Sequence, residues 1–522
     1  MKYAVDSRQM KIIDDYTINV LKVPAMVLME RAANDLAAFI KCKINKSDRI
    51  LAVCGSGNNG GDGIAAGRIL FLQGYHVAIL FIGDECKASS QVKEQLEIAR
   101  NLGMRLEHHN KLHEYNIIID AIFGIGLSRP ITGIYEEIIN QINKNQNIVF
   151  SVDIPSGISA DSGKILGTAV KADYTVTFGY QKQGLLLYPG ADYSGKIVIA
   201  DIGFPNEAAL QAKIETFYYE QEDLTRLPVR LNYSHKGTYG KVLVIAGSKG
   251  MAGAAYLSAK AAYRSGAGLV KILTSEANRV ILQTSLPEAL FTAYDEETET
   301  EARLEKIAKE ISWASVIVIG PGLGVSSSSE ELLTSVLEKA AVPVIIDADG
   351  ITLLSKLLDS ELLQLDYTEK QDRRMESLLT RTKILSDLLG EHTILTPHLM
   401  EFSRLIGISI TEITNNLIDT TCQCSYNNNL IYAIKDARSI VSQNHSRYIN
   451  TSGNNGMATG GSGDVLTGII AAFIAQGMKP YEAACLAVYI HGLAGDAAAD
   501  EKGKYSLMAG DIINFIEKVL HS

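Results

Sequence analysis

Short apolar runs alternate with segments of helical periodicity along most of the chain. The segment from Ala25 to Lys41 carries apolar residues at helical spacing and follows Pro24, a residue that a helix start tolerates. Helical patterns such as Ile64–Gln73 and Gln91–Leu102 separate several strand-like runs. This alternation predicts βαβ units and a mostly parallel sheet. The first strands are expected at Arg49–Cys54, His76–Ile82, Asn116–Ala121, Asn147–Val152, Asp173–Phe178 and Lys196–Ala200.

The pattern lapses from about Pro205 to Ser234 and then resumes with a second series of short, β-branched strands. We therefore expect a first domain over residues 1–215, a linker region over 216–234 and a second domain over 235–522. Continuous apolar strands are typical of sheets buried on both faces, so the predicted fold is α/β, with two α/β domains. The second series is expected at Lys241–Ala246, Leu269–Leu273, Ser315–Ile319, Pro343–Asp347, Thr393–Leu395 and Leu430–Lys435.

Residues 357–391 differ from the rest of the second domain. Many leucines are interspersed there with charged residues, which predicts an exposed, mostly helical insertion. We expect it to lie outside both sites and to pack against a neighbouring subunit of a homo-oligomer, and a lid over one site is the alternative. The charged residues are Asp366, Glu369, Lys370, Asp372, Arg373, Arg374 and Glu376.

Composition argues against several classes of protein. Hydrophobic residues make up 47% and charged residues 21% of the 522 residues, which indicates a folded chain. The formal charge is −10 without a basic stripe, so nucleic acid is not an expected partner. The six cysteines include no C-x-x-C pair, which indicates a reducing compartment. The N-terminus leads into no apolar segment and Val465–Met478 is too short to span a bilayer, so we expect a cytoplasmic protein without a membrane partner.

A glycine-rich turn follows the predicted strand Arg49–Cys54 and opens a helix. Gly55, Gly57 and Gly60 satisfy the G-x-G-x-x-G pattern in the strand–turn–helix context that it requires. Glycines let the backbone approach a phosphate, and the helix N-terminus supplies N–H donors. The pattern indicates a phosphate or dinucleotide site, and a tight βα turn is the alternative.

Polar residues follow three predicted strands of the first domain. Asn59 lies in the glycine-rich turn, Asp120 ends a second strand and Ser156 follows a third. The carboxyl ends of strands in an open α/β sheet border the ligand crevice, so these residues could converge there as hard oxygen ligands for a cation. The segment Gly124–Pro130 would add backbone donors. Roles as cap or turn residues are the alternative.

The first domain resembles the NAD(P)H-hydrate epimerase domain over about residues 1–215. The runs Asn58-Asn59-Gly60-Gly61-Asp62-Gly63, Gly124-Ile125-Gly126-Leu127 and Val152-Asp153-Ile154-Pro155-Ser156-Gly157 carry the resemblance, together with Asp120. It implies a Rossmann-like domain that interconverts the R and S epimers of hydrated NAD(P)H, with a potassium ion held by Asn59, Asp120 and Ser156. The implied substrate contacts are Asn58, Asn59, Gly60, Gly61, Asp62, Gly124, Ile125, Gly126, Leu127, Ser128, Arg129, Pro130 and Asp153.

The implied reaction suits a carboxylate at Asp153. The carbon that is epimerised carries a hydroxyl beside the ring nitrogen, and loss of hydroxide followed by its return from the other face inverts that carbon. A positioned carboxylate can move the proton and stabilise transient positive charge on the ring. Asp153 is therefore the predicted catalytic residue of the first domain.

The most informative motif of the second domain is the glycine-rich run from Asn454 to Gly468. It leads into a long apolar segment that is predicted to be helical. Its glycines expose backbone N–H groups at the helix start, which makes an anion hole for phosphate. No Gly-Lys-Ser/Thr follows, so the run is not a P-loop. Asp464 would lie in the anion hole, where it can deprotonate an attacking hydroxyl, and a plain N-cap is the alternative.

This run resembles the ribokinase-like superfamily, and further motifs narrow the resemblance to the ADP-dependent NAD(P)H-hydrate dehydratase domain over about residues 225–522. Nearly the whole chain thus resembles the bifunctional NAD(P)H-hydrate repair enzymes. The narrowing motifs are Gly247-Ser248, Gly253-Ala254-Ala255, Ser265-Gly266-Ala267-Gly268, Gly320-Pro321-Gly322-Leu323-Gly324, Asp347-Ala348-Asp349-Gly350 and Thr396-Pro397-His398.

The second resemblance implies that ADP, accompanied by magnesium, phosphorylates the hydroxyl of the hydrate and that phosphate elimination restores NAD(P)H. Asp464 would activate the hydroxyl. The implied hydrate contacts are Ala254, Gly322, His398 and Asp464, and the implied nucleotide contacts are Lys435, Asp436, Ala437, Arg438, Ser439 and Gly463.

Two segments depart from the family pattern. Leu399-Met400 replaces the usual Pro-Gly after His398, and Asp436 replaces the usual glycine after Lys435. An acidic residue beside phosphates is unexpected. Because the Asp464 run by itself also fits a vitamin or sugar kinase, a ribokinase-like kinase with an N-terminal binding domain is the alternative function.

Overall fold

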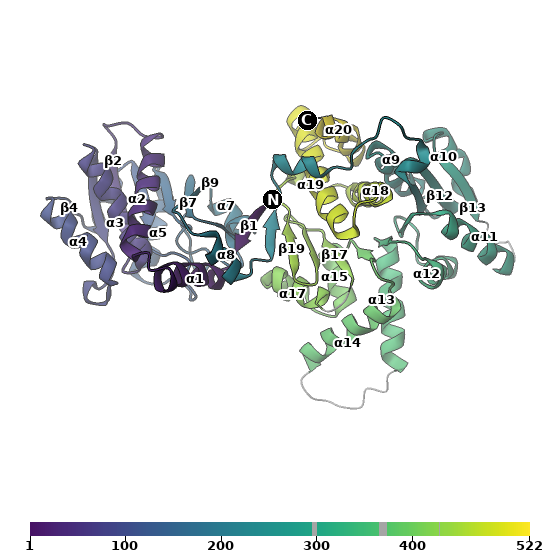
Figure 1. Cartoon of the computed structure of the whole chain (residues 1–522), viewed down its shortest axis with the longest axis horizontal. Coiled ribbons are helices and arrows are strands. Elements are labelled where there is room, and N and C mark those ends of the chain that lie inside the picture. The colour runs from purple at the N-terminus through teal and green to yellow at the C-terminus, as the bar shows by residue number, and fades with distance from the viewer. Residues whose placement is uncertain (295–299, 365–372, 427–428, 522) are drawn as a thin grey trace. The chain divides into compact units, whose positions relative to one another are not determined.

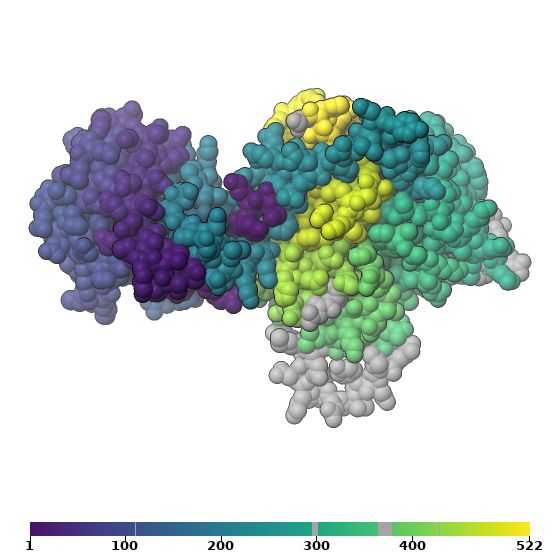
Figure 2. All heavy atoms as spheres, viewed as in Figure 1, coloured from purple at the N-terminus to yellow at the C-terminus, as the bar shows by residue number. Residues whose placement is uncertain are grey.

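The computed structural model describes the chain except for residues 295–299, 365–372, 427–428 and 522, which are grey in Figure 2. The described residues form two compact units. We call Tyr3–Thr216 the N-terminal unit, and Phe217–Ser522 together with Met1 and Lys2 the C-terminal unit. Each unit combines parallel strands with helices, so the prediction of two α/β domains is confirmed.

The N-terminal unit is built around a sheet with the strand order β4-β3-β2-β5-β6-β7-β9 (Figure 1). Every neighbouring pair of strands in it is parallel. The six strands predicted from apolar runs are confirmed as β2, β3, β5, β6, β7 and β9. The strand bounds are β1 Lys2–Val5, β2 Arg49–Cys54, β3 His76–Phe81, β4 Arg105–Leu106, β5 Ile117–Ala121, β6 Ile148–Val152, β7 Tyr174–Phe178, β8 Gln181–Lys182, β9 Lys196–Ala200 and β10 Thr216–Tyr218.

Helices cover both faces of this sheet. Helices α2, α3 and α4 pack on one face with Ile50 and Ala52 of β2, whereas α5 packs on the other face with Leu51 and Val53. Successive residues of β2 thus point into opposite cores, which is why the strand reads as a continuous apolar run. The helix bounds are α1 Ser7–Asp15, α2 Ala25–Lys41, α3 Asn58–Leu72, α4 Ser90–Asn101, α5 Ile134–Lys144, α6 Gln183–Leu186, α7 Gly190–Tyr193 and α8 Asn206–Ala212.

The strand order of this sheet reverses at the pair β2–β5. The chain passes from β2 to β3 and β4 on one side and then returns to β5 on the other. In open α/β sheets, ligands bind in the crevice outside the carboxyl ends of such a pair. The N–H of Gly55, which follows β2, donates to the carbonyl of Ala121 at the end of β5 at 3.0 Å. The predicted site residues that follow β2 and those that follow β5 therefore leave the sheet at neighbouring strand ends.

Helix α3 begins earlier than its apolar pattern predicted. It starts at Asn58, with Gly57 as its N-cap, so part of the predicted glycine loop is helical. A Cβ at Gly60 would overlap the carbonyl oxygen of Gly55, and a Cβ at Gly63 would overlap the Cβ of Ala121. These two glycines therefore let the first turns of α3 lie directly on the strand ends.

The C-terminal unit contains a second sheet with the order β13-β12-β11-β14-β15-β16-β17-β18-β19. Neighbours from β13 to β17 are parallel, and the six strands predicted there are confirmed. The antiparallel pairs β17–β18 and β18–β19 were not predicted. The order reverses at β11–β14, which marks a second ligand crevice. The strand bounds are β11 Lys241–Ile245, β12 Leu269–Ser275, β13 Leu290–Tyr294, β14 Val316–Ile319, β15 Val344–Ile346, β16 Ile394–Leu395, β17 Ile431–Ile434, β18 Ile440–Gln443 and β19 Ser446–Ile449.

Helices also cover both faces of the second sheet. Helices α9, α18, α19 and α20 share one apolar core, and α11 to α17 share the other. The apolar stretch that begins at Val465 is α18, a buried helix of the first core. Within the described ranges, no helix is both long enough and apolar enough to cross a membrane. The helix bounds are α9 Ala252–Arg264, α10 Arg279–Ser285, α11 Thr300–Trp313, α12 Ser327–Lys339, α13 Asp349–Gln364, α14 Arg373–Leu388, α15 Leu399–Ile406, α16 Ile410–Asn415, α17 Leu417–Ser425, α18 Ser462–Ala475, α19 Pro480–Lys502 and α20 Ala509–His521.

The predicted insertion at residues 357–391 is mostly helical where it is described, because it contains the end of α13 and the whole of α14. It is not wholly exposed, which corrects the prediction. Leu358, Leu378 and Leu385 are buried in the core shared by α11 to α17, so the interspersed leucines anchor both helices. The charged residues Asp366, Glu369, Lys370 and Asp372 lie outside the described residues, as do the side chains of Arg373, Arg374 and Glu376.

Replacing Gly60 with alanine should destabilise the N-terminal unit, because the new Cβ would overlap backbone atoms of Gly55. Overpacking of this kind costs about 1–3 kcal/mol in free energy of unfolding. Gly57→Ala is the matched control, since nothing lies within 4 Å of a Cβ at that position. Urea denaturation of both variants, followed by circular dichroism, measures the difference. Equal stability of the two variants would contradict the packing role.

Candidate functional sites

Asn59 lies in the first turn of α3 and faces the loop that follows β5. A Cβ at Gly124 would lie 3.2 Å from Asn59 Oδ1, so the two segments are in close contact. Asn59 Nδ2 is buried and has no hydrogen-bond partner within the described chain. A buried amide without a partner is costly unless a bound molecule supplies one. Asn59 is therefore a candidate contact for a ligand.

Asp120 is fully buried at the end of β5 and is held by two serines. Its carboxylate accepts hydrogen bonds from Ser151 Oγ at 2.8 Å, from Ser156 Oγ at 2.5 Å and from the Ser156 N–H at 2.9 Å. Burial raises the pKa of Asp120, and these hydrogen bonds offset part of the rise. The Phe123 N–H donates to Ser156 Oγ at 2.9 Å, so the loop that contains Gly124 is hydrogen-bonded to the serine that holds Asp120. Asp120 and Ser156 are thus brought together beside the loop that Asn59 touches.

Asp153 follows β6 with a φ of 63°, a left-handed conformation that is uncommon for a residue other than glycine. Residues held in such conformations cluster at functional sites. Asp153 Oδ1 accepts hydrogen bonds from Lys182 Nζ, from Thr177 Oγ1 at 3.1 Å and from the Phe178 N–H at 3.0 Å. Lys182 is fully buried, and its Nζ also donates to the Phe178 carbonyl at 2.9 Å. Three donors therefore hold the Asp153 carboxylate in one position, within an ion pair.

Two further carboxyl groups lie close to this ion pair. Burial raises the pKa of Asp62 well above its ordinary value, and the charges of Asp153 and Asp14 raise it further. Burial also raises the pKa of Asp14, to about 6. The positive charge of Lys182 opposes this rise, and the charge of Asp153 adds to it. Asp62 was predicted as a substrate contact, whereas Asp14 and Lys182 were missed. Lys182 stands before the apolar run Gly184–Leu187, which could have indicated burial, but no local signal marks Asp14.

The remaining predicted substrate contacts of this unit border the same loop. Gly124, Ile125 and Leu127 are partly buried, and Ile125 packs against two apolar clusters of the unit. Asn58 is exposed at the start of α3. The loop then runs to the surface, where its exposed members are Gly126, Ser128, Arg129 and Pro130.

Asp464 occupies the first turn of α18, in the C-terminal unit. The N-cap of α18 is Gly461, with a φ of 90°, so the alternative interpretation of Asp464 as the N-cap is wrong. Burial raises the pKa of Asp464 to about 7, Asp347 adds to the rise and Lys435 opposes it. The N–H groups of a first helical turn have no partners within the helix, so they can bind an anion beside this carboxyl.

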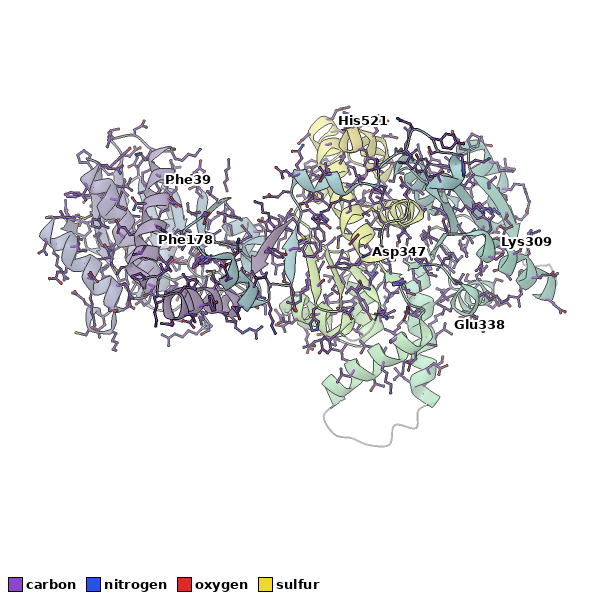
Figure 3. All side chains as sticks on the ribbon, viewed as in Figure 1. Phe39, Phe178, Lys309, Glu338, Asp347 and His521 are labelled. Atoms are coloured by element: carbon purple, nitrogen blue, oxygen red, sulfur yellow. The ribbon has the colours of Figure 1, made fainter. Side chains whose placement is uncertain are left out.

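Lys435 links the sheet edge to the start of α18. Its Nζ donates to Asp347 Oδ1 at 2.6 Å, and Asp347, labelled in Figure 3, is buried just past the end of β15. A Cβ at Gly463 would lie 3.0 Å from Lys435 Nζ and 3.6 Å from Asp347 Oδ2. Two predicted nucleotide contacts, Lys435 and Gly463, are therefore adjacent. The sequence motif that contains Asp347 predicted no role for it, and in the structure its carboxylate holds Lys435.

His398 caps α15. Its Nδ1 accepts hydrogen bonds from the Met400 N–H at 3.1 Å and the Glu401 N–H at 3.2 Å, and Glu401 Oε2 accepts from the His398 N–H at 2.9 Å. The Lys435 N–H donates to the Pro397 carbonyl at 2.8 Å, which places this cap beside Lys435. The departure at Leu399-Met400 is accommodated, because these two residues simply form the first positions of α15.

Ala254 and Gly322 meet at the other side of the second crevice. Gly322 has a φ of 56°, and a Cβ there would lie 2.9 Å from the Cβ of Ala254. The Ser248 N–H donates to the Gly322 carbonyl at 2.6 Å, and the Gly324 N–H donates to Asp349 Oδ2 at 2.8 Å. These contacts join the loops after β11 and β14, where the strand order reverses. The predicted hydrate contacts Ala254 and Gly322 are thus in contact with each other.

The predicted nucleotide segment from Lys435 to Ser439 forms the tight turn between β17 and β18. Asp436 and Ala437 are exposed at its tip, and Arg438 donates to the Thr451 carbonyl at 2.8 Å. Ser439 Oγ contacts the Asp436 carbonyl at 3.5 Å. The acidic side chain of Asp436 is therefore exposed to solvent at the turn.

Sequence reasoning missed two supports of the α18 start. Asp496 accepts hydrogen bonds from the Gly453 N–H at 2.8 Å and from Asn454 Nδ2 at 2.9 Å, which orders the segment that leads to α18. His491 is buried, and its Nε2 lies 3.3 Å from Ser462 Oγ. Burial lowers the pKa of His491 to about 4, so the ring is neutral near pH 7.

A cavity opens between α13 and α15 on the side of Glu401. Its lining includes Thr352, Ser355 and Lys356 from α13, with Glu401 and Arg404 from α15. Glu401 thus separates this cavity from the His398 cap. Burial raises the pKa of Glu401, and the charge of Lys435 opposes the rise.

Comparison with known proteins identifies the family. A family model described as NAD(P)H-hydrate dehydratase matches residues 242–518, and one described as YjeF-related protein N-terminus matches residues 25–184. The chain is 34% identical to the bifunctional NAD(P)H-hydrate repair enzyme Nnr of Thermofilum pendens over 98% of this chain and 95% of that protein. This chain belongs to the family of bifunctional NAD(P)H-hydrate repair enzymes.

Other members of the family match at similar levels. The enzyme of the same name from Moorella thermoacetica is 33% identical over 100% of this chain and 97% of that protein. A solved structure of the ADP/ATP-dependent NAD(P)H-hydrate dehydratase from Bacillus subtilis, co-crystallised with ATP and Mg²⁺, is 28% identical, with a TM-score of 0.46, and covers 58% of this chain and 96% of that chain. Membership confirms the bifunctional enzyme inferred from the sequence, and the full-length matches argue against the kinase alternative.

We expect Asp347→Asn to shift the pH dependence of the dehydratase reaction to lower pH. The negative charge of Asp347 raises the pKa of Asp464, so its removal lowers that pKa. A base must be ionised, so wild-type kcat/KM should decline as the pH falls through about 7, and the decline in the variant should move below that value. Glu361→Gln, an exposed change on α13, is the control. If the decline of kcat/KM at low pH occurred at the same pH in the variant and the wild type, the effect of Asp347 on the Asp464 pKa would be contradicted.

Proposed function

We propose that this chain epimerises the R and S hydrates of NAD(P)H in its N-terminal unit and dehydrates the S hydrate in its C-terminal unit with ADP. The observation that carries the proposal is the position of Asp464, whose pKa is raised by burial to about 7. It is placed at the N-terminus of α18, beside the ammonium group of Lys435. Phosphoryl transfer to a hydroxyl requires this combination of a poised base and positive groups around the phosphate.

Dehydration would begin when Asp464 removes the proton from the hydroxyl of the hydrate. The hydroxyl oxygen attacks the terminal phosphorus of ADP, and the bond from that phosphorus to its bridging oxygen breaks, which releases AMP. The α18 N-terminus and Lys435 would stabilise the transferring phosphoryl group. The ring nitrogen then expels phosphate from the carbon, and loss of a proton from the adjacent carbon restores the double bond of NAD(P)H.

The residues around Asp464 fit a nucleotide on one side and the hydrate on the other. Lys435 and Gly463 would face the phosphates, and Ala254, Gly322 and His398 would face the hydrate. Magnesium would enter with ADP, because no group of three or more acidic, histidine or cysteine side chains in the described part of the chain could hold a metal ion. Bound magnesium supplies charge neutralisation to the phosphates. The preference for ADP over ATP rests on the family resemblance.

Epimerisation would take place at the crevice between β2 and β5. Asp153, fixed by Lys182, Thr177 and Phe178, provides a negative charge for a ring that becomes transiently positive when the hydroxide leaves. Asn59, Asp62 and the loop from Gly124 to Pro130 would contact the substrate. The unpaired Nδ2 of Asn59 is available as a donor to it.

A potassium ion fits the oxygen atoms gathered near Asp120. The carboxylate of Asp120, the hydroxyl of Ser156 and the side-chain oxygen of Asn59 are hard ligands, and the Phe123 carbonyl lies 3.2 Å from Ser156 Oγ. A cation there would compensate the negative charge of Asp120, whose carboxylate is buried with only neutral donors around it. Bound potassium would supply this charge compensation and fix the adjoining loop.

We also propose that the protein is a cytoplasmic homo-oligomer. Its substrates derive from NAD(P)H, and exposed thiols such as Cys42 and Cys86 suit a reducing compartment. Leu363 of α13 and Leu379 of α14 are 87% and 59% exposed. Such leucines support the packing of a neighbouring subunit against these two helices.

Asp464→Asn should abolish dehydration and spare epimerisation. Loss of the base should lower the rate of ADP-dependent NAD(P)H formation from the S hydrate by roughly 100-fold or more. Conversion of R to S hydrate, followed by chromatography, should be unchanged because its residues lie in the N-terminal unit. Glu482→Gln, an exposed change on α19, is the control. A variant that still dehydrates at the wild-type rate would refute the role of Asp464.

Potassium should stabilise the N-terminal unit, and sodium should substitute poorly for it. Thermal unfolding and the epimerisation rate are measured in KCl and NaCl at equal ionic strength. Asp120→Asn should remove the difference between the two salts, whereas Asp173→Asn, outside the proposed site, should keep it. Identical unfolding temperatures and rates in both salts would count against a potassium site.

A further inference from the structure

Asp14 stands outside every motif of the N-terminal site. It lies in α1, before the residues 25–184 that the family model matches. Buried Met10 and Ile13 anchor α1 in a small apolar cluster, against which Ile125 and Tyr180 also pack. Ile125 belongs to the substrate loop, and Tyr180 closely precedes Lys182. Helix α1 is therefore packed against two segments of the epimerase site.

Three carboxyl groups share a single ammonium group in this site. Asp14, Asp62 and Asp153 all interact electrostatically with Lys182 or with one another. Lys182 is hydrogen-bonded to Asp153, whose Oδ1 accepts two further hydrogen bonds. Asp153 is therefore fully engaged, whereas neither Asp14 nor Asp62 forms an ion pair within the described chain. These two carboxyls are the groups that are free to exchange a proton.

The surroundings favour opposite protonation states for the two groups. Burial raises the pKa of Asp62 well above the ordinary value, which favours its protonated form. The pKa of Asp14 is raised only to about 6, so it is mostly ionised at pH 7. The other charges near Asp14 are those of Lys182, Asp153 and the adjacent Asp15, and α8, which packs against α1, carries only the exposed Glu207.

We propose that Asp62 and Asp14 form the acid–base pair of the epimerisation and that Asp153, held by Lys182, acts as a fixed counter-charge to the ring. This assignment rests on the proposed epimerase function and extends it, since it gives a catalytic role to a residue of α1. Proton transfer then belongs to the two mobile carboxyls, and Asp153 keeps only the electrostatic part of its predicted role.

The proposed step balances without any further reactant. Asp62 gives its proton to the hydroxyl oxygen as the carbon–oxygen bond breaks, and the lone pair of the ring nitrogen forms a carbon–nitrogen double bond. Water leaves, and the positive ring is stabilised by Asp153. A water molecule then attacks the opposite face of the carbon, and Asp14 accepts its proton as the new carbon–oxygen bond forms. Asp62 ends ionised and Asp14 protonated, which is the state that the reverse reaction requires.

Asp14→Asn tests the assignment in the full-length enzyme, with Asp15→Asn as the matched control on the same helix. With excess ADP, NAD(P)H formation from the R hydrate reports epimerisation, and formation from the S hydrate reports dehydration alone. We expect Asp14→Asn to slow the R-hydrate reaction by roughly 100-fold or more and to leave the S-hydrate reaction unchanged. Asp15→Asn should leave both reactions unchanged, because Asp15 is exposed.

The pH profile distinguishes proton transfer from a structural role. Wild-type epimerisation should decline as the pH falls through about 6, because Asp14 must be ionised to accept a proton. That limb should be absent from Asp14→Asn, and added formate should restore activity to Asp14→Ala. Circular dichroism checks that the variants fold. If they do not fold, the pH profile of the wild-type enzyme is the test, and a profile without the decline at low pH overturns the proposal.

Two other results would also overturn the acid–base pair. One is an Asp14→Asn rate from the R hydrate that equals that of Asp15→Asn. The other is a slow Asp14→Asn that retains the acidic limb, together with an Asp14→Ala that formate does not rescue. A wild-type enzyme that forms NAD(P)H from the S hydrate but never from the R hydrate would instead reject the epimerase function itself. The assay therefore separates failure of the pair from failure of the proposed function.

Discussion

The close approach of a helix N-terminus to the carboxyl edge of a parallel sheet is the constraint on which both sites depend. In the N-terminal unit, α3 lies on the strand ends because Gly60 and Gly63 leave room for the carbonyl of Gly55 and the side chain of Ala121. In the C-terminal unit, Gly463 leaves room for the Lys435–Asp347 pair at the start of α18. A methyl group at Gly60 or Gly63 would overlap these atoms and force the helix outward, and one at Gly463 would crowd the ammonium group of Lys435. The helix N–H groups would then separate from the side chains that converge at the strand ends.

Each site also contains one lysine paired with one aspartate at the sheet edge, and Lys182 is fully buried whereas Lys435 is partly buried. Lys182 holds Asp153 in the N-terminal unit, and Lys435 holds Asp347 in the C-terminal unit. Because each lysine already forms an ion pair with an aspartate, the neighbouring carboxyls have no cation of their own to offset the effect of burial on their pKa values. This explains why Asp14, Asp62 and Asp464 have raised pKa values while they lie close to an ammonium group. The pairs supply fixed charge, and the remaining carboxyls supply proton transfer.

The departures from the family pattern fall where the fold can absorb them. Leu399 and Met400 occupy the first turn of α15, and the cap between His398 and Glu401 depends on backbone N–H groups that any residue other than proline supplies at position 400. Asp436 is exposed at the tip of a turn between antiparallel strands, so its charge is solvated. Neither residue takes part in the ion pair between Lys435 and Asp347.

The sequence by itself determined most parallel strands of both units, because apolar β-branched runs are typical of strands covered on two faces. It also placed Asp464 at a helix start, since glycines followed by a long apolar segment mark one. It did not reveal that the first glycine run is helical, because the close contacts of Gly60 and Gly63 are with backbone and side chains of other elements. Asp14, Lys182 and the role of Asp347 also emerged only in three dimensions. Asp347 and Lys435 are 88 positions apart, and the strands that precede them, β15 and β17, flank β16 in the sheet. Local periodicity decides which segments are helices and strands, but the tertiary structure decides which charges share a buried site, because burial and charge proximity depend on that strand order.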